Sequence, residues 1–233
     1  MQKKRSKRYR AAAALVDSKK KLTLIEAISL LKTLPAPNFD QTVTLSFKLG
    51  VDPRQSDQMV RGTCPLPNGS GKTVRVLVFA TGSSADAARE AGAEFVGFED
   101  LIKKIQGGFS DFDVAIATPA AMAEVRKLGK VLGPRGLMPN PKTGTVTDDT
   151  ATAIKEVKAG RVEFKLDKNA NIAVPVGKFS FEPTALAENG SAVIEAVARS
   201  RPATAKGTFL HGITLSATMS PGLVVDPSPY LKS

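Results

Sequence analysis

Lysine and arginine are the residues of this sequence best suited to binding a ligand, and they are concentrated at its beginning. The first 21 residues hold a single acidic residue, Asp17, against nine basic ones: Lys3, Lys4, Arg5, Lys7, Arg8, Arg10, Lys19, Lys20 and Lys21. Like charges at this density repel one another unless a polyanion is bound. Tyr9 lies within the tract and adds a ring able to stack on a nucleic-acid base. A solubilising tail is the alternative, and polyanion binding is the interpretation we favour.

The positive charge is unevenly distributed along the chain. The formal net charge is +11, and lysines and arginines that neutralise phosphates release condensed counterions, which favours a polyanionic partner. Residues 1–72 hold 14 basic and 5 acidic side chains, residues 73–158 hold 11 of each, and residues 159–233 hold 8 and 6. The excess therefore lies outside the middle of the chain.

The middle of the chain alternates short apolar strands with helices of about ten residues. This alternation is typical of βαβ units, and the nearly continuous apolar strands indicate a parallel sheet covered on both faces. The sequence predicts a three-layer, Rossmann-like domain over residues 73–158. Its expected strands are 73–82, 94–97 and 112–119, and its expected helices are 84–94, 98–108 and 120–133.

The two flanks carry strands that alternate in polarity. Residues 39–51 and 207–219 do so most clearly, and helices are expected at 23–33 and 184–199. Because an isolated strand leaves its backbone groups unpaired, we expect one antiparallel sheet built from both ends of the chain, with 161–167 and 171–176 as further strands. The fold class is then α/β in two domains. Residues 1–72 and 159–233 form a basic, two-layer α+β domain that binds RNA, and 73–158 is inserted into it.

The polar faces of two expected strands form a second candidate binding feature. Hydroxyl groups both donate and accept hydrogen bonds, so a row of them suits phosphate oxygens and ribose hydroxyls. A solvated sheet face is the alternative, and the basic ends of the chain favour binding. The residues concerned are Thr42, Thr44, Ser46 and Lys48 on one strand and Thr208, Thr214, Ser216 and Thr218 on the other.

The sequence contains no evident set of nucleophile, base and orienting group. The single histidine, His211, is expected to be partly buried on the apolar side of its strand, and Asp148 and Asp149 are expected to cap a helix. Gly71, Lys72 and Thr73 end like a phosphate-binding loop, but Leu66 stands where that motif needs glycine. We therefore expect a protein that is not an enzyme and uses no cofactor and no metal.

Two further features concern location. Cys64 is the only cysteine, which excludes an internal disulfide and a zinc site built from several cysteines. No uninterrupted apolar run approaches the roughly 18 residues needed to cross a bilayer, and the beginning of the chain does not resemble a signal peptide. We expect a cytoplasmic protein without a membrane partner.

With these features in place, the chain resembles the family of bacterial-type large-subunit ribosomal protein one, the protein of the mobile stalk. The matching stretches follow one another along almost the whole chain. They are KRYRAAAALVD (7–17), FDQTV (39–43), LGVDPRQSDQMVRG (49–62), GKTVRVLVFATG (71–82), FDVAIATP (112–119), LGPRGLMPNPKTGTV (132–146), KAGRVEFKLDKN (158–169), AKGTFL (205–210) and TLSATMSPG (214–222).

The resemblance implies a two-domain fold with an inserted middle domain, and it implies partners. These are large-subunit ribosomal RNA, exit-site tRNA, whose release the protein would assist, and the messenger RNA of its own operon, whose translation it would repress. It further implies a monomer within the ribosome.

The resemblance also implies particular RNA-binding residues. The matching positions are Phe39, Thr42, Lys168, Thr218 and Met219. To these we add the polar and basic neighbours Lys7, Arg8, Tyr9, Arg10, Ser216 and Ser220.

Two positions depart from the family pattern. Ser220 stands where glycine is usual, and Leu166 where a polar residue is usual. A Cβ at Ser220 obstructs the close backbone approach that glycine permits, so we expect RNA binding to be retained with altered local contacts.

Overall fold

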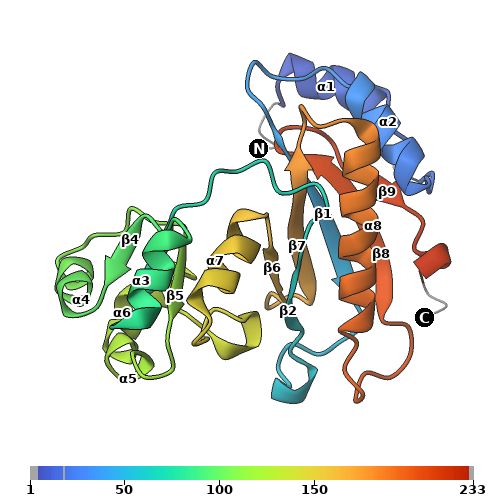
Figure 1. Cartoon of the computed structure of the whole chain (residues 1–233). Helices are drawn as coiled ribbons and strands as arrows, with labels where there is room; N and C mark the ends of the chain where they lie inside the picture. The colour runs from blue at the N-terminus through green and yellow to red at the C-terminus, as the bar shows by residue number, and fades with distance from the viewer. Residues whose placement is uncertain (1–4, 18, 231–233) are drawn as a thin grey trace. The chain divides into compact units, whose positions relative to one another are not determined.

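The computed structural model describes residues 5–17 and 19–230. Contacts within the chain define two compact units (Figure 1). The first unit comprises Met1–Gly71 and Val162–Ser233, and the second comprises Lys72–Arg161. The expected α/β class, with antiparallel pairing in the first unit and a parallel sheet in the second, is confirmed.

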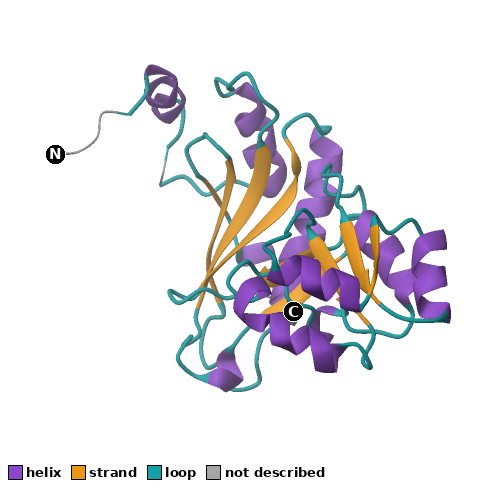
Figure 2. Cartoon of the chain, turned by 90° about the vertical axis from the view of Figure 1, so that its left-hand side faces the viewer, coloured by secondary structure: helices purple, strands orange, loops and turns teal. Residues whose placement is uncertain are grey.

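The first unit is built on a four-stranded antiparallel sheet whose strands run side by side (Figure 2). The helices α2 (Leu24–Thr33) and α8 (Pro183–Arg199) pack on one of its faces and on each other. The strands, in spatial order, are β7 (Asn171–Lys178), β1 (Thr42–Leu49), β8 (Leu210–Ala217) and β9 (Leu223–Val225). This arrangement forms the expected two-layer α+β domain.

Alternation of polarity explains why this sheet buries only one face. In β1 every second side chain is apolar and at most 2% exposed, and its neighbours in the sheet add more such residues. Burial of each large apolar side chain contributes about 2 kcal/mol. The core residues on this face are Val43, Leu45, Phe47, Leu49, Ile172, Val174, Val176, Ile213, Leu215, Leu223 and Val225.

The prediction that all strands from both ends of the chain form a single sheet is wrong for one strand. The strand β6 (Val162–Lys165) leaves the main sheet and pairs antiparallel with β2 (Arg61–Cys64), which the sequence did not predict. A turn separates β6 from β7, because the Asp167 carboxylate accepts hydrogen bonds from the backbone N–H groups of Asn169 (2.8 Å) and Asn171 (2.7 Å). The short strand β9 was also not predicted.

His211 is exposed, so its expected partial burial on the apolar side of β8 is wrong. The pairing of β1 with β8 explains why. Lys48 is opposite Gly212 and Leu49 is opposite Leu210, so His211 is the extra residue of a β-bulge. A bulge reverses the side-chain parity of its strand, and strict alternation read from the sequence fails beyond it.

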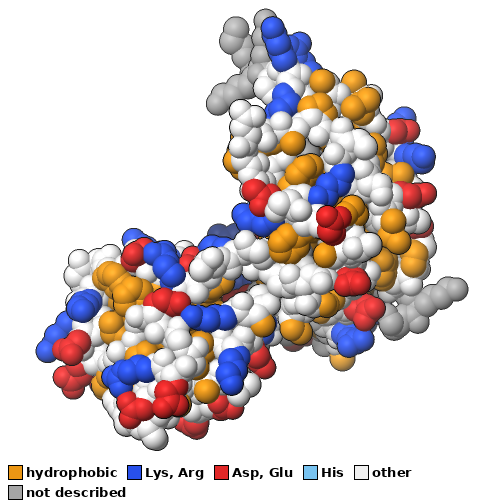
Figure 3. All heavy atoms as spheres, turned by 45° about the horizontal axis from the view of Figure 1, so that its top comes forward, with side chains coloured by type: hydrophobic (Ala, Val, Ile, Leu, Met, Phe, Trp, Pro, Cys, Tyr) orange, Lys and Arg blue, Asp and Glu red, His pale blue; other side chains and the backbone are white. Residues whose placement is uncertain are grey.

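The second unit is a three-stranded parallel sheet between two helical layers, as expected. The helices α3 (Ser83–Glu90) and α7 (Thr150–Lys158) cover one face, and α4 (Glu99–Gln106), α5 (Met122–Val125) and α6 (Gly129–Leu132) cover the other. The strands, in spatial order, are β4 (Phe95–Gly97), β3 (Val76–Phe79) and β5 (Val114–Ala117). On the face shown in Figure 3, basic and acidic side chains are mixed over this unit.

Two local expectations in the second unit have different outcomes. The helix expected at 120–133 is interrupted, because a 3-10 turn at Arg126–Leu128 separates α5 from α6, which begins at Gly129, a poor helix former. Asp149 caps α7 as expected, since its carboxylate accepts a hydrogen bond from the N–H of Thr152 at 3.0 Å.

Asp113 holds together the edge of the second unit where the strands begin. Its carboxylate contacts the Lys72 ammonium at 2.6 Å and accepts a hydrogen bond from the Arg75 N–H at 3.1 Å. The hydrogen bond from Lys72 is the largest cause that lowers the pKa of Asp113 below its ordinary value. A depressed pKa in the folded state means that these contacts stabilise the unit at neutral pH and are lost as Asp113 becomes protonated.

We therefore expect Asp113→Asn to lower the free energy of unfolding by about 1 kcal/mol at pH 7. The difference from the unaltered protein should shrink as the pH falls below about 4. Chemical unfolding followed at pH 7 and pH 3 checks this. A difference that stays constant or grows toward pH 3 would show that Asp113 does not act through its charge.

Among the residues that the structure describes, no helix is both long and apolar enough to cross a membrane.

Candidate nucleic-acid interface

The face of the first unit's sheet opposite α2 and α8 is lined with hydroxyl groups. On this face Thr44 is paired with Ser216 and Ser46 with Thr214, and all four side chains are partly exposed. Lys48 is on the same face and is exposed, and its ammonium donates to the Asn169 carbonyl at 2.5 Å. The two polar strand faces expected from the sequence thus form one surface.

Thr42 and Thr218 meet at one end of this surface. The Thr218 hydroxyl accepts a hydrogen bond from the Thr42 N–H at 3.1 Å, and the Thr218 N–H donates to the Thr42 carbonyl at 3.1 Å. The Lys178 ammonium donates to the Thr42 hydroxyl at 3.3 Å. Residues 176 positions apart are therefore fixed together at the sheet end, with a lysine beside them.

Gln41 holds the turn that follows β8. The residue is only 2% exposed, and its Oε1 accepts a hydrogen bond from the Met219 N–H at 3.0 Å. The Gln41 carbonyl accepts a hydrogen bond from the Phe179 N–H at 2.7 Å, so the same residue is also tied to the end of β7. The Met219 backbone is thereby fixed, whereas 51% of the Met219 residue surface remains exposed.

Ser220 turns its side chain inward. Its hydroxyl accepts a hydrogen bond from the Ala217 N–H at 2.8 Å and lies 2.9 Å from the Pro221 carbonyl, to which it donates. Ser220 therefore closes the turn, and its hydroxyl is engaged within the chain. The second departure, Leu166, is 3% exposed and belongs to the core, so it does not reach the polar surface.

The helix α1 (Lys7–Ala14) brings the basic tract to this turn. A cavity of about 410 Å³ is lined by Arg5, Ser6, Arg8, Tyr9, Thr218, Met219 and Ser220. The Ser6 hydroxyl caps α1 by accepting from the Tyr9 N–H at 3.2 Å. Five of the expected site residues, Arg8, Tyr9, Thr218, Met219 and Ser220, are thus brought together.

Other expected site residues do not line this cavity. Lys7 and Arg10 are exposed on α1, and Phe39 is 49% exposed just before β1, off the buried face on which alternation placed it. Ser216 is on the hydroxyl face within β8. Lys168 is exposed in the turn before β7, near the opposite end of β1 from Thr42, roughly 20 Å away along the strand. Lys3 and Lys4 lie outside the described residues.

Sequence reasoning missed Gln41 and Lys178. Gln41 directly precedes β1, outside the alternating pattern of that strand. Its role depends on a hydrogen bond to Met219, far along the chain, which no local pattern predicts. Lys178 follows the expected strand end at 176, and a register shift opposite Val43 and Thr44 brings it to the polar side. Val176 and Gly177 are consecutive and both buried, so strict alternation of buried and exposed residues breaks down just before Lys178.

No group of three or more His, Cys, Asp or Glu side chains able to hold a metal ion occurs within the described ranges. The chain thus combines a discontinuous α+β unit, which carries an open hydroxyl face beside basic side chains, with a three-layer α/β unit, and this face is the candidate nucleic-acid interface.

Comparison with known proteins shows the family to which the chain belongs. Residues 30–221 match the Ribosomal protein L1p/L10e family, and the chain belongs to that family. It is 57% identical over 225 residues to the large ribosomal subunit protein uL1 of Bifidobacterium longum subsp. infantis, covering 97% of this chain and 98% of that protein. The uL1 protein of Corynebacterium efficiens is 54% identical, with 96% and 94% covered, and that of Pseudarthrobacter chlorophenolicus is 53% identical, with 97% and 96% covered.

Proposed function

We propose that this chain is a structural protein of the large ribosomal subunit in the cytoplasmic ribosome, and that its first unit binds ribosomal RNA. The observation that carries the proposal is the open hydroxyl face that ends at the cavity beneath α1. Membership of the ribosomal protein family supports the same partner.

The chemistry of the surface suits structured RNA. Double-stranded RNA is recognised largely through its shape, its phosphates and its 2′-hydroxyl groups. Thr44, Ser46, Thr214 and Ser216 offer hydroxyls that both donate and accept, and Lys48 adds charge at the same face. The main interface would therefore use hydrogen bonds and phosphate neutralisation.

We assign RNA binding to the part of the chain that holds the excess positive charge. Residues 1–72 and 159–233 would form the RNA-binding domain, with the expected residues Lys7, Arg8, Tyr9, Arg10, Phe39, Thr42, Lys168, Ser216, Thr218, Met219 and Ser220 at its surface. Residues 73–158, with equal numbers of basic and acidic side chains, would be an inserted domain that leaves RNA affinity to the first.

The finer proposal places the protein, as a monomer, on the mobile stalk. There it would assist release of tRNA from the exit site and would also bind and repress its own operon messenger RNA. The resemblance of long stretches such as 49–62 and 132–146 to the stalk protein family supports this. If one surface serves both RNAs, an excess of the ribosomal fragment should relieve repression in a cell-free translation assay. Repression that persists unchanged would separate the two roles.

Lys48 provides a specific test of the hydroxyl face. We expect Lys48→Ala to reduce the slope of log affinity against log salt by about one, because one phosphate contact is lost, and to weaken binding similarly for related RNA sequences. Lys155→Ala removes an exposed cation of the second unit and should leave the slope unchanged. Equal slopes for Lys48→Ala and the unaltered protein would remove this face from the interface.

A further inference from the structure

We propose that the cavity between α1 and the turn at Thr218–Ser220 receives one unstacked nucleotide of the bound RNA, with its base against the Tyr9 ring. The inference rests on the proposed RNA binding and goes further, because it assigns an extruded nucleotide to a defined cavity in addition to contacts with the sheet face.

The lining of the cavity has the groups that hold an exposed base. Bases splayed out of a helix stack on aromatic rings and on arginine guanidinium planes. The cavity offers the Tyr9 ring, the Arg5 and Arg8 guanidinium groups and the Met219 thioether chain. Its volume of about 410 Å³ lies within the range of small-ligand pockets, which begin at about 300 Å³.

The charge of the cavity suits a nucleotide phosphate. The residues lining it include two arginines and no acidic side chain. Neither Arg5 nor Arg8 forms an ion pair within the described part of the chain. A guanidinium binds phosphate oxygens in a bidentate manner, so Arg8 and the Arg5 donors that are not used on the Tyr9 hydroxyl can hold the backbone on either side of an extruded base.

Each wall of the cavity is held by contacts within its own part of the chain. The Arg5 guanidinium donates to the Tyr9 hydroxyl at 2.8 Å and lies 4.6 Å from the ring centroid. On the other side, Gln41 holds the Met219 N–H and the inward-turned Ser220 hydroxyl closes the turn. A site whose walls are already ordered loses less entropy on binding.

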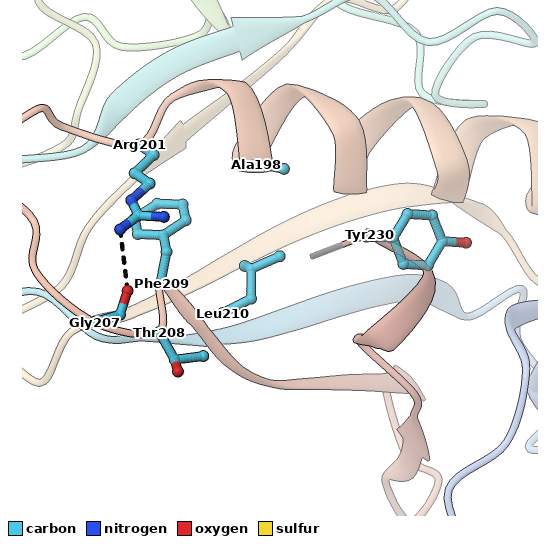
Figure 4. Close-up of a pocket in the computed structure, with 7 residues that line it drawn as sticks. All are labelled: Ala198, Arg201, Gly207, Thr208, Phe209, Leu210 and Tyr230. Carbon is cyan, nitrogen blue, oxygen red and sulfur yellow. Dashed lines mark hydrogen bonds between the residues drawn. The ribbon is translucent and has the colours of Figure 1, made fainter. Parts of the chain in front are cut away.

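Two other cavities in the described part of the first unit lack this combination. In the cavity of Figure 4 the Arg201 guanidinium already donates to the carbonyls of Ala205 (3.1 Å) and Gly207 (3.0 Å). Tyr230 is on the side of that cavity away from Arg201 (Figure 4). A third cavity, between α2 and α8, is lined by Glu188 and Glu195, which would repel a phosphate.

The composition of the chain allows a direct measurement. The sequence has two tyrosines and no tryptophan, so Tyr230→Phe leaves Tyr9 as the only strong intrinsic fluorophore. In the full-length Tyr230→Phe protein, a saturating amount of the stalk region of large-subunit RNA should quench tyrosine fluorescence, because a base stacked on the ring deactivates it. An RNA duplex without unpaired bases should cause little quenching at equal occupancy.

Affinity provides the second readout. Tyr9→Ala and Tyr9→Leu should each weaken binding of the stalk RNA about ten-fold, whereas Tyr9→Phe should stay near the affinity of the unaltered protein because it keeps the ring. Tyr230→Ala is the matched control and should not change the affinity. The thermal unfolding midpoints of the Tyr9 variants should remain unchanged, since Tyr9 is partly exposed on a surface helix.

The outcomes separate this inference from the function on which it rests. Specific RNA binding by the unaltered protein, combined with unquenched Tyr9 fluorescence and equal affinities for all Tyr9 variants, would overturn the nucleotide site alone. Loss of affinity in Tyr9→Phe equal to that in Tyr9→Ala would also overturn it, because the hydroxyl and not the ring would then matter. Absence of any preference for the stalk RNA in the unaltered protein would contradict the proposed function itself.

Discussion

Replacing Asn189 with alanine is expected to lower the free energy of unfolding of the first unit by about 3 kcal/mol. Asn189 is in the middle of α8 and is fully buried. Its amide nitrogen donates to the carbonyls of Gly69 (3.0 Å) and Val176 (2.8 Å), and its Oδ1 accepts from the Asn68 N–H (2.9 Å). One side chain therefore joins the helix, a strand and the segment that leads away from the first unit.

The magnitude follows from what alanine would leave behind. Three backbone groups would lose their partner, and each buried polar group without a hydrogen bond costs about 1–3 kcal/mol, reduced where water can enter. Urea unfolding of Asn189→Ala, compared with Ser191→Ala on the more exposed side of the same helix, measures the effect. A loss below about 1 kcal/mol, or one equal to that of the control, would contradict the assigned role.

Replacing both Thr218 and Met219 with alanine is expected to weaken specific RNA binding by about 1–3 kcal/mol, the scale of a good specific contact. Thr218 fixes the end of β1 through the Thr42 N–H, and Met219 presents a half-exposed side chain beside α1. The double substitution thus removes a contact surface and loosens the sheet end that carries it.

The matched control for this pair is on the opposite side of the sheet. Ile25 is 68% exposed and Thr33 is exposed, both on α2, so Ile25→Ala with Thr33→Ala removes similar groups away from the hydroxyl face. Binding of the stalk RNA by gel shift or calorimetry compares the two double variants. An unchanged affinity for Thr218→Ala with Met219→Ala would remove these residues from the interface.

Elements whose hydrophobic pattern is local were predictable from the sequence. The alternation around Val43, Leu45 and Phe47 decides which face of β1 is buried, because side chains of a strand point alternately to opposite faces. The order of strands and helices in the second unit and the cap at Asp149 follow from equally local signals. In each case burial or a nearby backbone group determines the structure.

Features that depend on distant residues were not predictable. The exposure of His211 depends on a bulge opposite β1, and the pairing of β2 with β6 joins segments about a hundred positions apart. The cavity arises because α1 meets a turn more than two hundred residues further along the chain. Gln41 acts there through one hydrogen bond to Met219, and no spacing within the sequence reports such a contact.

The most direct test of the central claim is a salt titration of binding between the full-length protein and a stalk fragment of large-subunit ribosomal RNA, with an unrelated hairpin of equal length as competitor. We predict an affinity well above that for the competitor, persisting at physiological salt, because hydrogen bonds and shape add to phosphate neutralisation. Equal affinities that fall together as salt rises would show that the basic tract binds any polyanion, and would contradict specific recognition of ribosomal RNA.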